Sequence, residues 1–142
     1  MQVENILQSK GATVHTVTAG APLSEAVRLL NAHKIGAVVV VDAKGKVAGI
    51  LSERDIVRRL DGDLAQLLAS PVRSAMTSKV ITATKAHSVS DLMELMTRHR
   101  IRHIPVVEGT ALVGIVSIGD VVKRKIEETE QEALALREYI AS

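Results

Sequence analysis

The sequence predicts a mixed α/β (α+β) fold made of two similar halves, and three observations support this prediction. Residues 14–41 match residues 80–107 at an offset of 66 residues, and the offset becomes 65 after one residue is lost in a turn. Each copy shows the same succession of apolar patterns. Hydrophobic residues make up 46% of the chain but aromatic residues only 1%, so the core must be aliphatic. Because a copy of about 60 residues is marginal alone, we expect the two copies to pack against each other.

A helix is predicted near the start of each copy, because apolar residues recur at positions i, i+3, i+4 and i+7. This stripe is formed in the first copy by Leu23, Ala26, Val27 and Leu30, and in the second by Val89, Leu92, Met93 and Met96. Ser24 and Ser90 lie near the two helix starts. We expect their side-chain oxygens to cap free backbone amides there.

Two strands follow the helix in each copy. Ala37–Val41 and Ile104–Val107 are short, continuous and β-branched, which is typical of buried strands. A turn that contains glycine separates each from a second strand, at Lys46–Leu51 and Ala111–Val116. A serine then opens a new helix. Each copy is therefore predicted to run strand, helix, strand, strand, helix.

The segment between the copies predicts the domain boundaries. Leu64–Ala69 reads as a short helix that Pro71 ends, and residues 72–76 echo residues 3–7 as a lead-in to each copy. We predict a first domain with its lead-in at residues 1–62 and a second at 79–125. A linker with the second lead-in would occupy residues 63–78, and a helical extension residues 126–142.

The last helix is predicted to be unusually long. Apolar and small residues alternate spacings of four and three along it, which is a heptad seam, at Val122, Ile126, Thr129, Ala133, Leu136 and Ile140. Two interpretations stay open. The helix could lie on the core of its own domain, or its seam could pair with a second subunit.

A serine followed three residues later by an aspartate stands after a Gly-Ile strand end in both copies. The pairs are Ser52 with Asp55 and Ser117 with Asp120. Amides at a helix start attract phosphate, a serine hydroxyl can add a hydrogen bond, and an aspartate suits a pair of ribose hydroxyls. The same spacing is also that of a capping box, which only satisfies the amides of the helix itself. The residues alone leave both interpretations open.

The chain resembles a tandem pair of cystathionine-β-synthase (CBS) domains, a Bateman module, of the stand-alone bacterial type. The resemblance covers about residues 1–125 and rests on the order and doubling of short segments at residues 33–40, 49–55, 72–77, 101–107 and 114–120. It implies two pseudo-twofold-related domains with two clefts that bind adenosine compounds: AMP, ADP, ATP, NAD(H) or S-adenosylmethionine. It also implies a homodimer.

The resemblance implies a role for each matching residue. Asp55 and Asp120 would hold ribose hydroxyls. The phosphate would be contacted by Ser52, Arg54, Arg102, His103 and Ser117, and the base by Thr16, Ile50, Ile81, Thr82 and Ile115. The first copy has Gly36 and Ala37 where the second has Arg102 and His103. We therefore expect unequal sites, with the second better suited to a charged phosphate.

Composition argues against other classes of protein. The net charge is only +2 although the isoelectric point is about 9.1, and aromatic residues for base stacking are missing, so nucleic-acid binding is not expected. The longest apolar run, Ala37–Val41, is too short to span a membrane, and no signal peptide is visible, so we expect a cytoplasmic protein. There is no cysteine, and the histidines lack metal-binding spacing. We predict no metal site and no catalytic residues.

These observations predict a regulatory module rather than an enzyme. It would bind an adenine nucleotide, sense energy or redox state, and modulate a partner protein that the sequence does not name. The alternative is a ligand-independent CBS scaffold that uses its last helix for oligomerisation.

Overall fold

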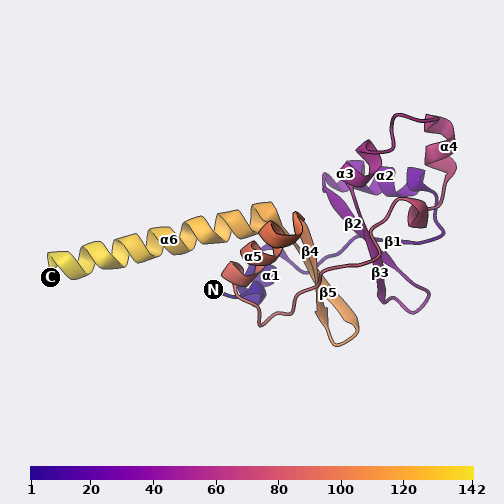
Figure 1. Ribbon diagram of the computed structural model, residues 1–142. Coiled ribbons are helices and arrows are strands. Elements are labelled where there is room, and N and C mark those ends of the chain that lie inside the picture. The colour runs from indigo at the N-terminus through magenta and orange to yellow at the C-terminus, as the bar shows by residue number, and fades with distance from the viewer.

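The computed structural model describes all residues, 1–142, and shows a mixed α+β chain with two small sheets (Figure 1). The fold class predicted from the sequence is confirmed. The first part of the chain contains α1 (Val3–Lys10), β1 (Thr16–Thr18), α2 (Leu23–His33), β2 (Ala37–Val41), β3 (Val47–Ser52) and α3 (Glu53–Val57). α4 (Leu64–Ala69) and a 3-10 turn (Val72–Ser74) lead to α5 (Val89–His99), β4 (His103–Glu108), β5 (Ala111–Ser117) and α6 (Ile118–Ala141).

The two sheets repeat the same pairing. β1 runs parallel to β2, with Val17 opposite Val40, and β2 is antiparallel to β3. In the second copy β4 is antiparallel to β5, and a single parallel bridge joins Ala83 to Val106 at the matching position. Each sheet also has its register shift at the same place in the repeat. The prediction of a first strand in the second copy was wrong, because only this one bridge forms there.

The helices also end alike but begin differently. α2 and α5 both finish on a residue in the left-handed conformation, Lys34 (φ 52°) and Arg100 (φ 53°), which are equivalent in the repeat. The expectation that Ser24 and Ser90 cap these helices was wrong, since both lie inside the first turn. α5 is capped instead by Ser88, whose Oγ accepts from the amide of Asp91 at 3.0 Å, and α2 has no side-chain cap.

Two aliphatic cores form, and the lead-in segments are exchanged between them. Val3, Ile6 and Leu7 of α1 are buried in the core of the second copy, together with residues of α5, β4 and β5. Val72 and Ala75 are buried in the core of the first copy. Figure 1 shows α1 beside α5, far along the chain from it. The packing thus crosses the domain boundaries expected from the sequence, which stay a prediction.

Two glycines without side chains allow the lead-ins to pack closely against the strands. A Cβ atom built on Gly49 of β3 would lie 2.6 Å from Met76 Sδ and 3.0 Å from the backbone oxygen of Thr77. One built on Gly114, its equivalent in β5, would lie 2.7 Å from Leu7 Cδ2. Real Cβ atoms do not come so close. The glycine of each Gly-Ile strand end therefore serves close packing against the other lead-in.

α6 packs only at its start. Val121 is 1% exposed, whereas every residue from Thr129 onward is exposed. Figure 1 shows the helix projecting away from both sheets. Of the two interpretations of its heptad seam, packing on its own core is therefore wrong. No helix is both long and apolar enough to cross a membrane.

Replacing Gly49 tests the close approach of the lead-in. Gly49→Ala is expected to destabilise the protein by about 1–3 kcal/mol, the usual range for overpacking a core, measured by denaturant unfolding. Gly62→Ala is the matched control, because a Cβ there meets no heavy atom closer than 4.0 Å. Equal stability of the two variants would contradict the packing described.

Candidate functional site

A cavity of about 570 Å³ lies between the two copies and is lined by residues of both. The first copy contributes the end of β3 and the start of α3, including Ile50, Ser52 and Asp55. The second copy contributes residues 99–103, between α5 and β4. The segment after the second lead-in adds Thr77, Lys79, Val80 and Ile81. No single copy could form this cavity.

Seven of the predicted site residues line this cavity. They are Ile50, Ser52, Arg54, Asp55, Ile81, Arg102 and His103. Arg102 and His103, on which the expectation of a better phosphate site in the second copy rested, line the cavity that contains Asp55. They therefore lie with the first aspartate rather than the second, and which of the two sites takes a phosphate stays a prediction.

The other predicted residues lie elsewhere. Thr16 lines a separate hollow beside the two hairpin turns, and Thr82 is exposed outside the cavity. Ile115, Ser117 and Asp120 lie at the equivalent strand end of the second copy. The geometry thus brings neither threonine beside a predicted ribose or phosphate residue, and their contact with a base stays a prediction.

Both Ser-x-x-Asp pairs form capping boxes. Asp55 Oδ2 accepts from the amide of Ser52 at 2.9 Å and from its hydroxyl at 3.0 Å, while Ser52 Oγ accepts from the amide of Asp55 at 3.3 Å. Ser117 and Asp120 repeat this arrangement at 2.8, 3.0 and 3.3 Å. Each serine hydroxyl donates to its own aspartate, and a contact of either serine with phosphate stays a prediction. In both aspartates the second oxygen, Oδ1, has no hydrogen-bond partner within the chain, and that of Asp55 can accept from a ligand in the cavity.

Positive charge dominates the wall of the cavity. The carboxylates there belong to Glu53 and Asp55, whereas the Lys and Arg side chains are Arg54, Arg58, Lys79, Arg100 and Arg102. No ion pair within 4.0 Å joins any of these cations to either carboxylate. Charge-assisted hydrogen bonds from unpaired cations are the strong contacts to an anion. The sequence analysis missed Lys79 and Arg100, and only the doubling of the lead-in could have pointed to Lys79.

His103 is half-buried between the copies. A Cβ on Gly36 would lie 3.1 Å from its Cε1 and Nε2 atoms, so the glycine that replaces arginine in the first copy makes room for this ring. Burial lowers the pKa of His103 below its ordinary value of 6.5. The negative charges of Glu53 and Asp120 act against this shift, and Lys10 and Arg102 add to it. His103 is therefore neutral at pH 7.

The second aspartate is paired within the chain. Lys10 Nζ lies 2.7 Å from Asp120 Oδ2 and donates to the backbone oxygen of Ile115 at 2.9 Å. Burial acts to raise the pKa of Asp120, but the hydrogen bonds from Lys10 and Ser117 outweigh it and leave the pKa lowered. Asp120 is thus a carboxylate that already has a cation.

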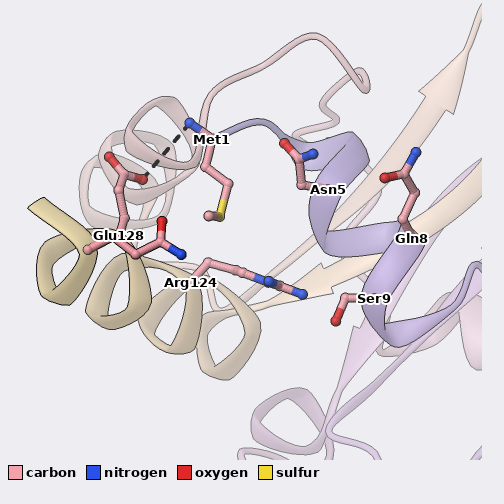
Figure 2. A pocket seen from close by; sticks show the side chains of 7 residues that line it. Met1, Asn5, Gln8, Ser9, Arg124 and Glu128 are labelled. Atoms are coloured by element: carbon pink, nitrogen blue, oxygen red, sulfur yellow. Dashed lines mark ion pairs between the residues drawn. The ribbon is translucent and has the colours of Figure 1, made fainter. Parts of the chain in front are cut away.

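A further hollow, of about 640 Å³, lies between α1 and α6 and is polar (Figure 2). Its wall includes Arg124 and Glu128 of α6, and the Met1 amino group lies 4.0 Å from the Glu128 carboxylate. None of the predicted site residues lines it. No group of three or more potential metal ligands converges in the structure. His15 and His33 stack face to face, with ring centroids 3.6 Å apart.

Comparison with known proteins identifies the family. The family model described as CBS domain matches residues 6–62 and residues 72–127. The chain belongs to the CBS domain family. It is 35% identical to the mitochondrial CBS domain-containing protein CBSX3 of Arabidopsis thaliana, across 97% of this chain and 71% of that protein. It is 34% identical to the CBS domain-containing protein YhcV of Bacillus subtilis, across 85% and 86%.

Solved CBS structures share the fold. The CBS-domain containing protein ATU1752 from Agrobacterium tumefaciens is 47% identical and superposes with a TM-score of 0.83, covering 87% of this chain and 92% of that one. The CBS domain pair of protein MJ0100, solved with 5′-methylthioadenosine and S-adenosyl-L-methionine, is 27% identical with a TM-score of 0.80, covering 90% and 98%. The resemblance inferred from the doubled motifs is thereby confirmed.

The buried neutral His103 should make the stability of this CBS pair depend on pH. As the pH falls through 6.5, the unfolded chain takes up a proton that the folded chain resists, so the folded state loses stability until the pH passes below the lowered folded pKa. His103→Gln removes this contribution. We expect its melting temperature to fall less than that of the wild type between pH 7.5 and 5.5. Parallel curves would show that His103 does not titrate between the two states.

Proposed function

We propose that this CBS pair is a regulatory module that binds an adenine nucleotide in the cavity between its two copies. The observation that carries the proposal is a single cavity that holds both Asp55, whose Oδ1 has no partner in the chain, and several cations without an ion pair. A carboxylate oxygen is an acceptor for ribose hydroxyls, and the cations are donors to phosphate. Asp55 and the cations line one cavity, and a ribose-phosphate needs an acceptor and cationic donors close together.

The aliphatic part of the cavity suits the base. Ile50, Ile81 and Ile101 supply apolar walls, and the cavity volume lies within the range of small-molecule sites. In a chain without Phe or Trp, adenine would be held by such side chains and by the backbone. Thr16, Thr82 and Ile115 stand apart from this cavity, so the base site proposed here consists of the isoleucines alone.

The charge of the cavity narrows the class of ligand. The MJ0100 pair was solved with S-adenosyl-L-methionine and 5′-methylthioadenosine, neither of which carries a phosphate. Here Arg54, Arg102 and the other cations favour a ligand with one or more phosphates. AMP, ADP, ATP and NAD(H) meet this requirement, and the common adenosine-phosphate half is what the site would read.

A ligand in this cavity would touch both copies and could therefore change their relative tilt. A ligand shifts the equilibrium between two tilts only by the difference in its binding free energy for them. We propose that the shift is passed to a regulated partner protein in the cytoplasm, and that the module itself carries out no catalysis. Sensing of energy or redox state would follow from which nucleotide binds best.

Arg102 provides the sharpest test of the phosphate position. Arg102→Met should weaken ATP binding about tenfold, since a hydrogen bond to a charged group contributes about 1.5–3 kcal/mol when buried and less at an exposed guanidinium. Adenosine, which has no phosphate, should bind the variant and the wild type equally. Both affinities can be measured by isothermal titration calorimetry.

The control for this test is Arg98→Met, because Arg98 pairs with Glu94 on the exposed side of α5. It should leave both affinities unchanged. An equal loss of adenosine and ATP binding in Arg102→Met would remove Arg102 from the phosphate position. A wild-type chain that binds neither compound, nor AMP or NADH, would reject the proposed function.

The projecting α6 favours a second candidate, a scaffold that assembles without a ligand. The seam residues Val122, Ile126, Leu136 and Ile140 are between 46% and 74% exposed. We propose that this seam pairs with the α6 helix of a second copy and makes the chain a homodimer, whether or not nucleotide binds. A pure scaffold would form this dimer and show no thermal shift with AMP, ATP or NADH.

Charge introduced on the seam tests the dimer. Leu136→Glu with Ile140→Glu should convert the dimer to a monomer in sedimentation velocity, because like charges would face each other across a coiled-coil seam. Leu134→Glu is the matched control, since Leu134 is 56% exposed on the same helix but lies off the seam. Dissociation by Leu134→Glu, or a double variant that stays dimeric, would place the contact elsewhere.

A further inference from the structure

Lys10 lies where the second cleft would have to receive a ribose. It holds Asp120 at 2.7 Å and the backbone oxygen of Ile115 at 2.9 Å. Asp120 and Ile115 are the repeat equivalents of Asp55 and Ile50, which line the open cavity of the first cleft. The aspartate is thus without a cation in the first copy and paired with an ammonium group in the second, and the Ile115 oxygen accepts from Lys10 where the Ile50 oxygen accepts from the amide of Thr77.

The two lead-ins explain the difference. Lys79 follows the second lead-in, residues 72–76, by three residues, as Lys10 follows the first, residues 3–7. The first lead-in forms the eight-residue helix α1, which ends at Lys10. The second forms only the 3-10 turn Val72–Ser74, and the chain then runs along β3, where Thr77 and Ile50 exchange two backbone hydrogen bonds of 2.9 Å. Lys79 consequently faces the cavity without pairing with Asp55.

Hydrogen bonds and packing hold α1, which ends at Lys10, against the second copy. The amide of Val3 donates to the oxygen of His87 at 2.9 Å, and the amide of Val89 donates to the oxygen of Met1 at 3.0 Å. Leu7 packs against Gly114 in the strand that leads to Ser117. Figure 2 shows the Met1 amino group directed toward Glu128 of α6, the same helix whose first turn carries Asp120. The helix is anchored at both ends against the second copy.

We propose that Lys10 is an internal blocking group that occupies the ribose position of the second cleft, so that the chain binds one nucleotide, at Asp55. This inference rests on the proposed function and adds its stoichiometry and the residue that sets it. Both clefts carry the Ser-x-x-Asp pair, but only in the second is the aspartate paired with a lysine. Removal of the ammonium group would expose Asp120 and open the second cleft.

Equilibrium dialysis with radiolabelled AMP tests this proposal on the full chain. The wild type should bind one AMP per chain. Lys10→Met should bind two, and Lys44→Met, which removes a lysine from the turn between β2 and β3, should still bind one. Asp55→Ala and Asp120→Ala form a matched pair, because each loses the same capping box. Binding to an otherwise wild-type chain should be lost in Asp55→Ala and kept in Asp120→Ala.

Each result decides the matter. Two AMP molecules per wild-type chain, or one per chain in both the wild type and Lys10→Met, would overturn the role of Lys10 while leaving the proposed function standing. Loss of binding in Asp120→Ala with retention in Asp55→Ala would reverse the assignment of the clefts and overturn it too. No binding in the wild type, in Lys10→Met or in Lys10→Gln would reject the proposed function and this inference together. One site in Lys10→Met that is absent from the wild type would reject only the first cleft as a binding site.

Discussion

The close approach at Gly49 and Gly114 fixes how the two copies pack. At each glycine the lead-in of the opposite copy lies where a Cβ atom would be, through Met76 in one case and Leu7 in the other. These contacts tie each lead-in to the core of the opposite copy and hold the copies at a set distance. The cavity depends on that distance, because Asp55 and the residues Arg102 and His103 that line it come from different copies.

The duplicated motif shows how surroundings decide what a residue does. Both aspartates cap a helix with one carboxylate oxygen, and the capping geometry is nearly identical. What differs is the neighbouring lead-in, which brings an ammonium group to Asp120 and none to Asp55. Gly36, the equivalent of Arg102 in the repeat, also has a role of its own. Because it has no side chain, the ring of His103 fits between the copies. The cavity beside Asp55 is thus a composite of both copies.

Periodicity and doubling in the sequence were enough to predict the fold class, the long last helix, and the order of strands and helices except for the first strand of the second copy. They worked because each of these features depends on local patterns, such as the stripe of α2 or the valine run of β2. The pairing of Arg102 and His103 with Asp55 could not be predicted, because it depends on which lead-in enters which core. The prediction that Ser90 rather than Ser88 caps α5 also failed on local detail, since either of two serines two residues apart can start a helix. Lys10 gave no signal at all, because a lysine at the end of a helix is usually only a favourable charge there.

The second Ser-x-x-Asp pair lies at the base of α6, the helix that projects from the two sheets. Ser117 and Asp120 cap α6, and Lys10 joins that cap to α1. The 24 residues of α6 span about 36 Å at 1.5 Å per residue, so a tilt of about 5° at its base would move its far end by about 3 Å. α3, which Ser52 and Asp55 cap, has only five residues, so the same tilt would move its end much less. If the proposed function holds, a nucleotide at Asp55 would have to act on α6 across the copies, where the ring of His103 lies beside Gly36 of the first copy.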